Sequence, residues 1–227
     1  MERETFPTRA LLACGAVAGP LYVSVTMIEA LTRDGFDLRR HRFSWLTTGE
    51  LGWIHQGAMV GVGLLSVLLA IGLRRSLRRG RSAVWAPRLL ALFGIAYVVG
   101  GLTRADPVVG FPPGTTADMV RTTWHGVVQN ASRSASTLSL LAASFAIAAW
   151  FAGQGRRAWA WLYATGIPAV FGALTAVGLA VGGNPVALAF LMTPWIWVTT
   201  LAVQLLREVT PPRQLIPPRA PPLTATT

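Results

Sequence analysis

A few polar side chains stand out from an otherwise apolar chain, and their types and spacing indicate where chemistry could occur. The stretch from Trp124 to Trp150 carries His125, Gln129 and Arg133 at intervals of four residues. In a helix this spacing stacks the three side chains on one face. An arginine inside a membrane segment usually faces the bundle interior and marks a candidate functional site. The pattern therefore predicts a polar, functional face on this stretch.

Further polar residues extend this set. Ser136 widens the same face, Glu29 ends the first apolar block, His55 lies near the start of the second, and Asp106 follows the third. A charge at the centre of a spanning helix costs roughly 2.5–3.5 kcal/mol on insertion scales. We therefore expect Arg133 to have a carboxylate partner, either Glu29 or Asp106. Such a pair would be a structural pin between helices or part of a functional site, and the sequence favours neither.

The first class of function that these residues indicate is binding. An outward-facing polar pocket would hold a small molecule or a lipid headgroup, with Arg133 gripping an anion. The residues expected to line this pocket are Arg133, Gln129, His55 and Ser136. Transport fits less well, because only the fourth apolar block is strongly polar and no polar path continues to the cytoplasmic side.

The second class is an enzyme built in the membrane, and the sequence does not decide whether the chain is one. His125 would act with Asp106 or Glu29 as general acid and base, since burial tunes the pKa of such groups. An apolar interior beneath them suits an isoprenoid or lipid substrate, for cyclisation, isomerisation or hydrolysis.

Three other interpretations remain open. His55 and His125 at matched depth could hold a b-type haem, but both lie near the membrane surface and no second pair exists. The same histidines with a carboxylate could hold zinc, but the familiar metallohydrolase spacings are absent. We therefore expect neither a metal nor a cofactor. A non-catalytic assembly or regulatory subunit is equally compatible with the sequence.

Six apolar blocks must position these residues, and each has close to the roughly 20 residues that span a bilayer as a helix. The blocks are Leu11–Leu31, Leu51–Leu73, Val84–Leu102, Thr123–Phe151, Ala158–Gly182 and Val186–Leu206. Hydrophobic residues make up 52% of the chain and charged residues only 13%, which points away from a soluble domain. The sequence predicts an all-α bundle of six transmembrane helices over residues 1–208. Residues 209–227 contain three Pro-Pro pairs and are predicted to form a disordered cytoplasmic tail.

The charges favour a membrane topology over a nucleic-acid partner. The net charge is +11, and all 20 basic residues are arginines that lie mostly between the apolar blocks. With the N-terminus inside, 12 arginines fall in cytoplasmic segments and 6 in outer loops, so both termini are predicted to be cytoplasmic. The expected partners are the lipid bilayer and a small-molecule or lipid ligand, with no nucleic acid. Cys14 is the only cysteine, which excludes an internal disulfide.

Several short motifs together resemble a known family. They are the passage from Ser44 to Gly52-Trp53, the Asp106-Pro107 loop, the Pro112-Pro113-Gly114 turn and the His125-Gly126 helix start. They resemble the bacterial membrane proteins grouped as domain of unknown function 998, over nearly all of the chain before the proline-rich tail. The resemblance implies a six-helix bundle in the bacterial cell membrane and no established activity. Asp106 and His125 match the most recognisable motif positions of that family.

Overall fold

The fold is built from six long helices. The computed structural model describes residues 2–77, 80–181 and 184–209. The long helices are α1 (Glu2–Thr32), α2 (Gly52–Ser76), α3 (Ser82–Gly101), α4 (Trp124–Gly153), α5 (Arg157–Val181) and α6 (Pro185–Val209). Two short 3₁₀ helices, η1 (Phe43–Thr47) and η2 (Ala117–Met119), lie in the connections. The all-α prediction is confirmed, since the described residues contain only one isolated β-bridge, between Val108 and Phe111. Of the predicted tail, residues 209–227, all but the last residue of α6 lie outside the described residues.

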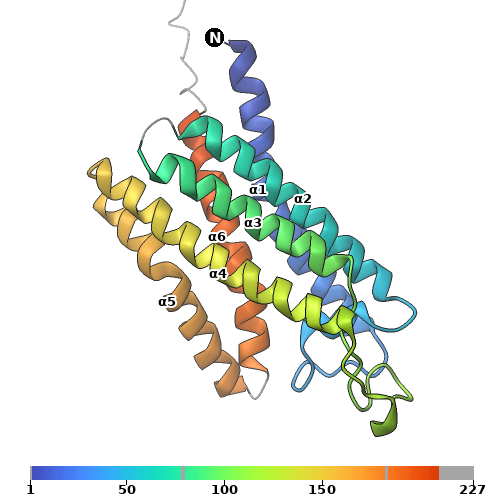
Figure 1. Ribbon diagram of the computed structural model, residues 1–227. Coiled ribbons are helices and arrows are strands. Elements are labelled where there is room, and N and C mark those ends of the chain that lie inside the picture. The colour runs from blue at the N-terminus through green and yellow to red at the C-terminus, as the bar shows by residue number, and fades with distance from the viewer. Residues whose placement is uncertain (1, 78–79, 182–183, 210–227) are drawn as a thin grey trace, which may run out of the picture.

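The six helices form a closed ring. Each helix packs against its neighbours in sequence, and α6 returns to pack against α1. The start of α1 and the end of α6 lie at the same end of the bundle (Figure 1). The opposite end carries the two long connections, residues 33–51 and 102–123. We call it the loop end.

All six long helices are long and apolar enough to cross a bilayer. Large apolar side chains on their outer surfaces are exposed, among them Leu64, Leu92, Phe145, Trp161 and Leu179. Such a surface requires lipid rather than water around it. The chain is therefore a multi-pass membrane protein, as its apolar blocks predict. The cytoplasmic placement of its termini remains a prediction.

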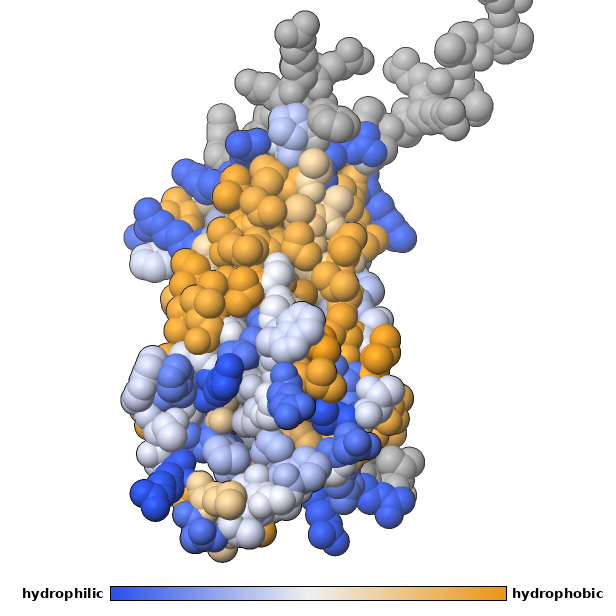
Figure 2. Space-filling model, turned by 90° about the vertical axis from the view of Figure 1, so that its right-hand side faces the viewer, coloured by the Kyte–Doolittle hydropathy of each residue, from blue (hydrophilic) through white to orange (hydrophobic). Residues whose placement is uncertain are grey.

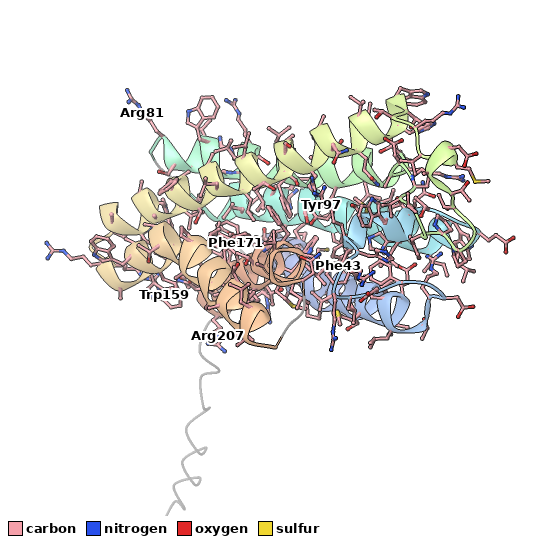
Figure 3. All side chains as sticks on the ribbon, turned by 90° about the horizontal axis from the view of Figure 1, so that it is seen from below. Phe43, Arg81, Tyr97, Trp159, Phe171 and Arg207 are labelled. Atoms are coloured by element: carbon pink, nitrogen blue, oxygen red, sulfur yellow. The ribbon has the colours of Figure 1, made fainter. Side chains whose placement is uncertain are left out.

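The loop end is much more polar than the rest of the surface. Figure 2 shows a band of hydrophobic residues nearer the end that holds the termini, and mainly hydrophilic residues toward the loop end. Figure 3 shows Arg81 pointing away from the bundle, whereas Tyr97 lies among the helices. The concentration of polar residues at the loop end agrees with the position of the predicted functional residues.

Backbone contact between α2 and α3 fixes the helix that carries His55. A Cβ atom at Gly63 would lie 2.6 Å from the carbonyl oxygen of Gly94, and one at Gly94 would lie 2.6 Å from that of Gly63. Gly57 and Gly61, in the same helix, also have the spacing of four residues that is typical of helix packing, but they make no such contact. A Cβ atom at either of those glycines would meet nothing within 4 Å. Small residues at a spacing of four do not reveal which of them touch another helix.

The Gly63 contact gives a testable difference. Replacing Gly63 with Ala must push α2 away from the α3 backbone, so we expect the free energy of unfolding in detergent to fall by about 1–3 kcal/mol. The matched control, Gly61→Ala in the same helix, meets open space and should leave stability unchanged or slightly raised. Equal melting temperatures for the two variants would contradict the close α2–α3 contact.

Candidate functional site

The carboxylate of Glu29 is the centre of the polar site at the loop end. Its Oε1 accepts a hydrogen bond from the Arg33 guanidinium at 2.9 Å. Its Oε2 lies 2.8 Å from Nδ1 of His55, which therefore carries the proton and donates. Glu29 is 6% exposed and His55 is fully buried. A buried charge needs both a counter-charge and hydrogen bonds, and Glu29 has both.

The other ring nitrogen of His55 faces Tyr22. Its Nε2 lies 3.3 Å from the Tyr22 hydroxyl, which acts as the donor because Nδ1 already holds the ring proton. The Tyr22 ring packs against Tyr97 and Trp195, with centroid distances of 5.6 and 5.1 Å. The polar chain from Arg33 through Glu29 and His55 to Tyr22 thus runs from the loop end into the aromatic interior of the bundle.

The same network fixes the first connection. Arg33 donates to the carbonyl oxygens of Leu46 at 3.0 Å and Thr48 at 3.4 Å, which hold η1 against the end of α1. Because Arg33 follows Glu29 by four residues in α1, both side chains lie on one face of that helix.

Thr47 in η1 joins the first connection to the second connection and to α4. Its Oγ1 donates to Ser44 O at 2.8 Å and accepts from Ala105 N at 2.9 Å and from Gln129 Nε2 at 3.2 Å. Gln129, a predicted ligand-binding residue, is thereby committed to holding η1. Ser136, another, is buried and donates to the Arg133 carbonyl of its own helix at 2.8 Å.

The predicted pairing of Arg133 with Glu29 or Asp106 is wrong. Arg133 is exposed, and its guanidinium donates to Asn130 Oδ1 at 3.3 Å. Glu29 is bound by Arg33 and His55, and neither carboxylate lies within 4.0 Å of Arg133. The physical reason is helix geometry, because a step of four residues advances about 40° around a helix with 3.6 residues per turn. Gln129 therefore faces the interior, while Arg133 lies on the flank.

Asp106 serves the start of α4 instead. Its Oδ1 accepts from Thr123 N at 3.0 Å and from Thr123 Oγ1 at 2.6 Å. Thr123 caps α4, since its Oγ1 also accepts from Gly126 N at 3.2 Å. A carboxylate beside a helix N-terminus is favourable because of the helix dipole. A Cβ atom at Gly126 would collide with the Asp106 carboxyl group, which explains the glycine there.

His125 stands apart from the Glu29–His55 pair. Its ring stacks on Trp124 at a centroid distance of 3.6 Å, and its buried Nδ1 forms no hydrogen bond. His55 contacts Glu29 and Tyr22 whereas His125 contacts Trp124, so the two histidines share none of these partners. Within the described ranges, no three His, Cys, Asp or Glu side chains gather as a metal ion would require.

Arg42 and Arg133 are neighbouring guanidiniums at the loop end, and neither has a counter-charge within 4.0 Å among the described residues. Arg42, just before η1, lies close enough to Arg133 for their positive charges to repel. Arg42 packs over the Trp45 ring at 6.0 Å, and both arginines are exposed. Among the described residues, neither forms an ion pair within 4.0 Å. An anion placed near both would relieve this repulsion.

Aromatic side chains hold the two connections together. The ring of Phe111, in the second connection, is buried against Phe36 and His41 of the first, at centroid distances of 5.3 and 5.2 Å. Burial lowers the pKa of His41, Asp37 acts in the opposite direction, and Arg40 lowers the pKa further. The neutral ring suits its contact, because Nδ1 accepts a hydrogen bond from Asp37 N at 3.0 Å.

Two hollows in the described surface lie away from the predicted residues. One, of about 60 Å³, is an apolar groove between α5 and α6 whose lining includes Tyr163, Gly166 and Thr193. The other lies at the end of the bundle opposite the loop end, and its lining includes Ser82 and Trp150. Neither is lined by a residue predicted to bind ligand or to catalyse a reaction.

Sequence reasoning missed four members of the site, namely Tyr22, Arg33, Arg42 and Thr47. Arg33 could have been found from its spacing of four residues after Glu29, and Tyr22 from its position seven residues before it, on the same helical face. Arg42 and Thr47 lie in a connection, where no periodicity indicates the direction of a side chain.

Comparison with known families agrees with the fold. Residues 16–204 match the family described as "Protein of unknown function (DUF998)". This match covers most of the chain, which therefore belongs to that family. No curated protein and no solved structure matches the chain.

Glu29, Arg33 and His55 form a cluster, and we expect the replacement of Glu29 to destabilise the protein strongly. Replacing Glu29 with Ala leaves the buried His55 and Arg33 without their acceptor, so the free energy of unfolding in detergent should fall by about 3–5 kcal/mol. Asp34→Ala, at an exposed position five residues later, should change it by less than about 0.5 kcal/mol. A Glu29→Ala variant that unfolds at the same denaturant concentration as Asp34→Ala would show that the cluster contributes no stability.

Proposed function

We propose that the loop end binds the phosphate headgroup of a membrane phospholipid that carries a net negative charge, with Arg42 and Arg133 as the anion contacts. The observation that supports this proposal is the pair of exposed, mutually repelling guanidiniums that lack a counter-charge. Guanidinium groups match phosphate oxygens with two parallel hydrogen bonds, which makes arginine well suited to such a ligand.

The depth of Arg133 favours a lipid over a free anion. Arg133 is the tenth residue of α4, roughly 13 Å along the helix from Trp124. A long arginine side chain at this depth reaches toward the interface, where lipid phosphates lie. The same flank of α4 exposes Asn130 and Thr137, so the polar strip continues beside the guanidinium.

The buried cluster supports this role indirectly. Gln129 and Arg33 both hold η1, and Arg42 directly precedes that element. Because η1 is fixed on two sides, Arg42 is presented at a defined place relative to Arg133. The arginine count predicts that this surface lies on the outer side of the membrane, with cytoplasmic termini, and the family resemblance implies a bacterial cell membrane; the proposal retains both predictions.

A membrane enzyme is the second candidate, and the Glu29–His55 contact favours it. A histidine oriented by a carboxylate is the usual arrangement of a general base. Both side chains are more than nine-tenths buried, however, so a substrate would have to enter the packed bundle. Asp106 is bound by Thr123, the cap residue of α4, and His125 stacks on Trp124 and hydrogen-bonds neither Glu29 nor Asp106. The exposed arginines therefore give binding the stronger support.

If the loop end binds an anionic lipid, replacing either Arg42 or Arg133 should weaken that binding. We expect nanodiscs containing phosphatidylglycerol to raise the melting temperature of the protein relative to nanodiscs of phosphatidylcholine alone. Arg133→Gln and Arg42→Gln should each weaken the binding of phosphatidylglycerol by about tenfold or more, because each removes one charge-assisted hydrogen-bond donor group. The matched control is Arg88→Gln, which removes an exposed arginine from a different spanning helix and should bind normally.

Inorganic phosphate tests whether the bound anion is a lipid headgroup or a free anion. If millimolar phosphate in phosphatidylcholine nanodiscs stabilises the protein as well as phosphatidylglycerol does, the ligand is a free anion. If Arg133→Gln and Arg42→Gln bind phosphatidylglycerol as tightly as the unaltered protein, the proposed site is wrong.

A further inference from the structure

We propose that the apolar groove between α5 and α6 binds the ring of a membrane-soluble quinone, with the hydroxyl of Thr193 as the hydrogen-bond donor to a ring carbonyl oxygen. The groove lies apart from the polar network and the arginines of the loop end, so this binding does not depend on the proposed lipid site. Three features carry it: the shape of the groove, a buried hydroxyl without a partner, and the depth of that hydroxyl in the membrane.

The groove lies where α5, at one edge of the bundle, packs against α6 (Figure 1). Its volume is about 60 Å³, and Tyr163 and Trp197 form part of its wall. Leu162 and Ile196 also line it and are 45% and 46% exposed, so the groove opens toward the lipid. A water-sized group needs roughly 10–15 Å³, so about five such groups fit inside. This is room for one edge of a single ring, with the rest of the molecule in the lipid.

Gly166 of α5 leaves this space open. A Cβ atom at Gly166 would meet only Leu162 Cδ1 among the described residues, at 3.7 Å, which is an ordinary contact. Close backbone contact requires a glycine at Gly63 and Gly94, but no such contact requires one here. A glycine inside a helix costs stability relative to alanine. The glycine is therefore explained by the space that it leaves in the groove.

The hydroxyl of Thr193 is the unsatisfied polar group in the groove. Thr193 is 4% exposed, and its Oγ1 forms no hydrogen bond with the described part of the chain. Hydroxyls in membrane helices commonly donate to a carbonyl oxygen of the preceding turn. Ser66, Ser139 and Thr165 do so in this chain. Thr200 also lines the groove, but it is only half-buried and lies seven residues, roughly 10 Å, along α6 from Thr193.

The aromatic wall of the groove offers no second free donor. Trp197 Nε1 donates to Ser144 Oγ at 3.0 Å, and the Tyr163 hydroxyl donates to Gln204 Oε1 at 3.0 Å. A buried donor without an acceptor is unfavourable, and a ligand oxygen beside Thr193 would relieve that cost. A carbonyl oxygen accepts and does not donate, so it matches one free hydroxyl and needs no further partner.

The depth of Thr193 determines which class of lipid can supply that oxygen. α6 has 25 residues, and Thr193 is the ninth of them, roughly 12 Å along the helix from its start. This places the hydroxyl inside a hydrocarbon layer about 30 Å thick. The phosphate and ester oxygens of phospholipids lie at the edges of that layer. A quinone carries carbonyl oxygens on an apolar ring and dissolves in the layer itself, so it fits both the depth and the single donor.

The test compares duroquinone with durene, which has the same carbon skeleton without the carbonyl oxygens. Each probe is titrated into the full-length protein in phosphatidylcholine nanodiscs. Its dissociation constant follows from the rise in melting temperature with probe concentration. We expect duroquinone to bind more tightly than durene by about two- to tenfold, the range for one hydrogen bond.

Thr193→Val removes the donor and keeps the shape of the side chain. It should weaken duroquinone binding by about two- to tenfold and leave durene binding unchanged. The unliganded variant should be at least as stable as the unaltered protein, because the hydroxyl that it loses has no partner. The matched control is Thr165→Val, which removes a hydroxyl that donates to Trp161 O outside the groove and should bind both probes normally.

A second pair of variants tests the space rather than the hydrogen bond. Gly166→Leu fills the groove and should weaken the binding of both probes by about tenfold or more, since neither ring can then enter. Gly172→Leu adds the same side chain to α5 outside the groove lining, where a Cβ atom would meet nothing within 4 Å. This control should bind both probes as the unaltered protein does.

Quinone binding in the groove is overturned if neither probe binds, or if duroquinone and durene bind equally tightly. It is also overturned if Thr193→Val or Gly166→Leu binds duroquinone as tightly as Gly172→Leu does. Binding of phosphatidylglycerol at Arg42 and Arg133 is measured separately on the same samples, so failure of the groove leaves the arginine site standing, and the converse holds.

Discussion

The two carboxylate oxygens of Glu29 hold the loop end together. One oxygen binds Arg33, which reaches over to the backbone of η1, and the other binds His55, which ties α1 to α2. In η1, Thr47 accepts hydrogen bonds from Ala105 of the second connection and from Gln129 of α4. A buried carboxylate is tolerated only when its charge and lone pairs are matched, so this set of residues is interdependent. Three helices and both long connections therefore depend on one ionised group.

That interaction also explains why neither Arg42 nor Arg133 pairs with Glu29. Glu29 is fully occupied by residues close to it in the fold, and Asp106 is occupied at the start of α4. Arg42 and Arg133 are consequently displayed at the polar end without a counter-charge of their own. In a membrane, the abundant anion at that depth is the lipid phosphate. The buried charges of Glu29 and Arg33 therefore neutralise each other inside the protein. The exposed charges of Arg42 and Arg133 have no such partner and remain able to bind an anion.

The sequence predicts the helices well because their length and apolar content are dictated by the bilayer itself. The site was harder to predict, for three reasons that particular residues illustrate. Arg133 lies four residues after the buried Gln129, but the offset of about 40° per step places it on the flank of α4. The sequence predicts that Glu29 or Asp106 pairs with Arg133, but Arg33, on the next turn of the same helix as Glu29, binds the Glu29 carboxylate instead. Thr47 could not have been identified, since the path of an irregular connection leaves no periodic signal.

The most direct measurement of the central claim is a pair of double-mutant cycles on unfolding in detergent. One cycle combines Glu29→Gln with Arg33→Gln, and the other combines Glu29→Gln with Arg133→Gln. Residues in one buried network couple by about 0.5–3 kcal/mol, whereas residues without a shared partner are additive within about 0.5 kcal/mol. The account predicts strong coupling of Glu29 to Arg33 and additivity with Arg133. Additivity with Arg33 together with strong coupling to Arg133 would contradict it.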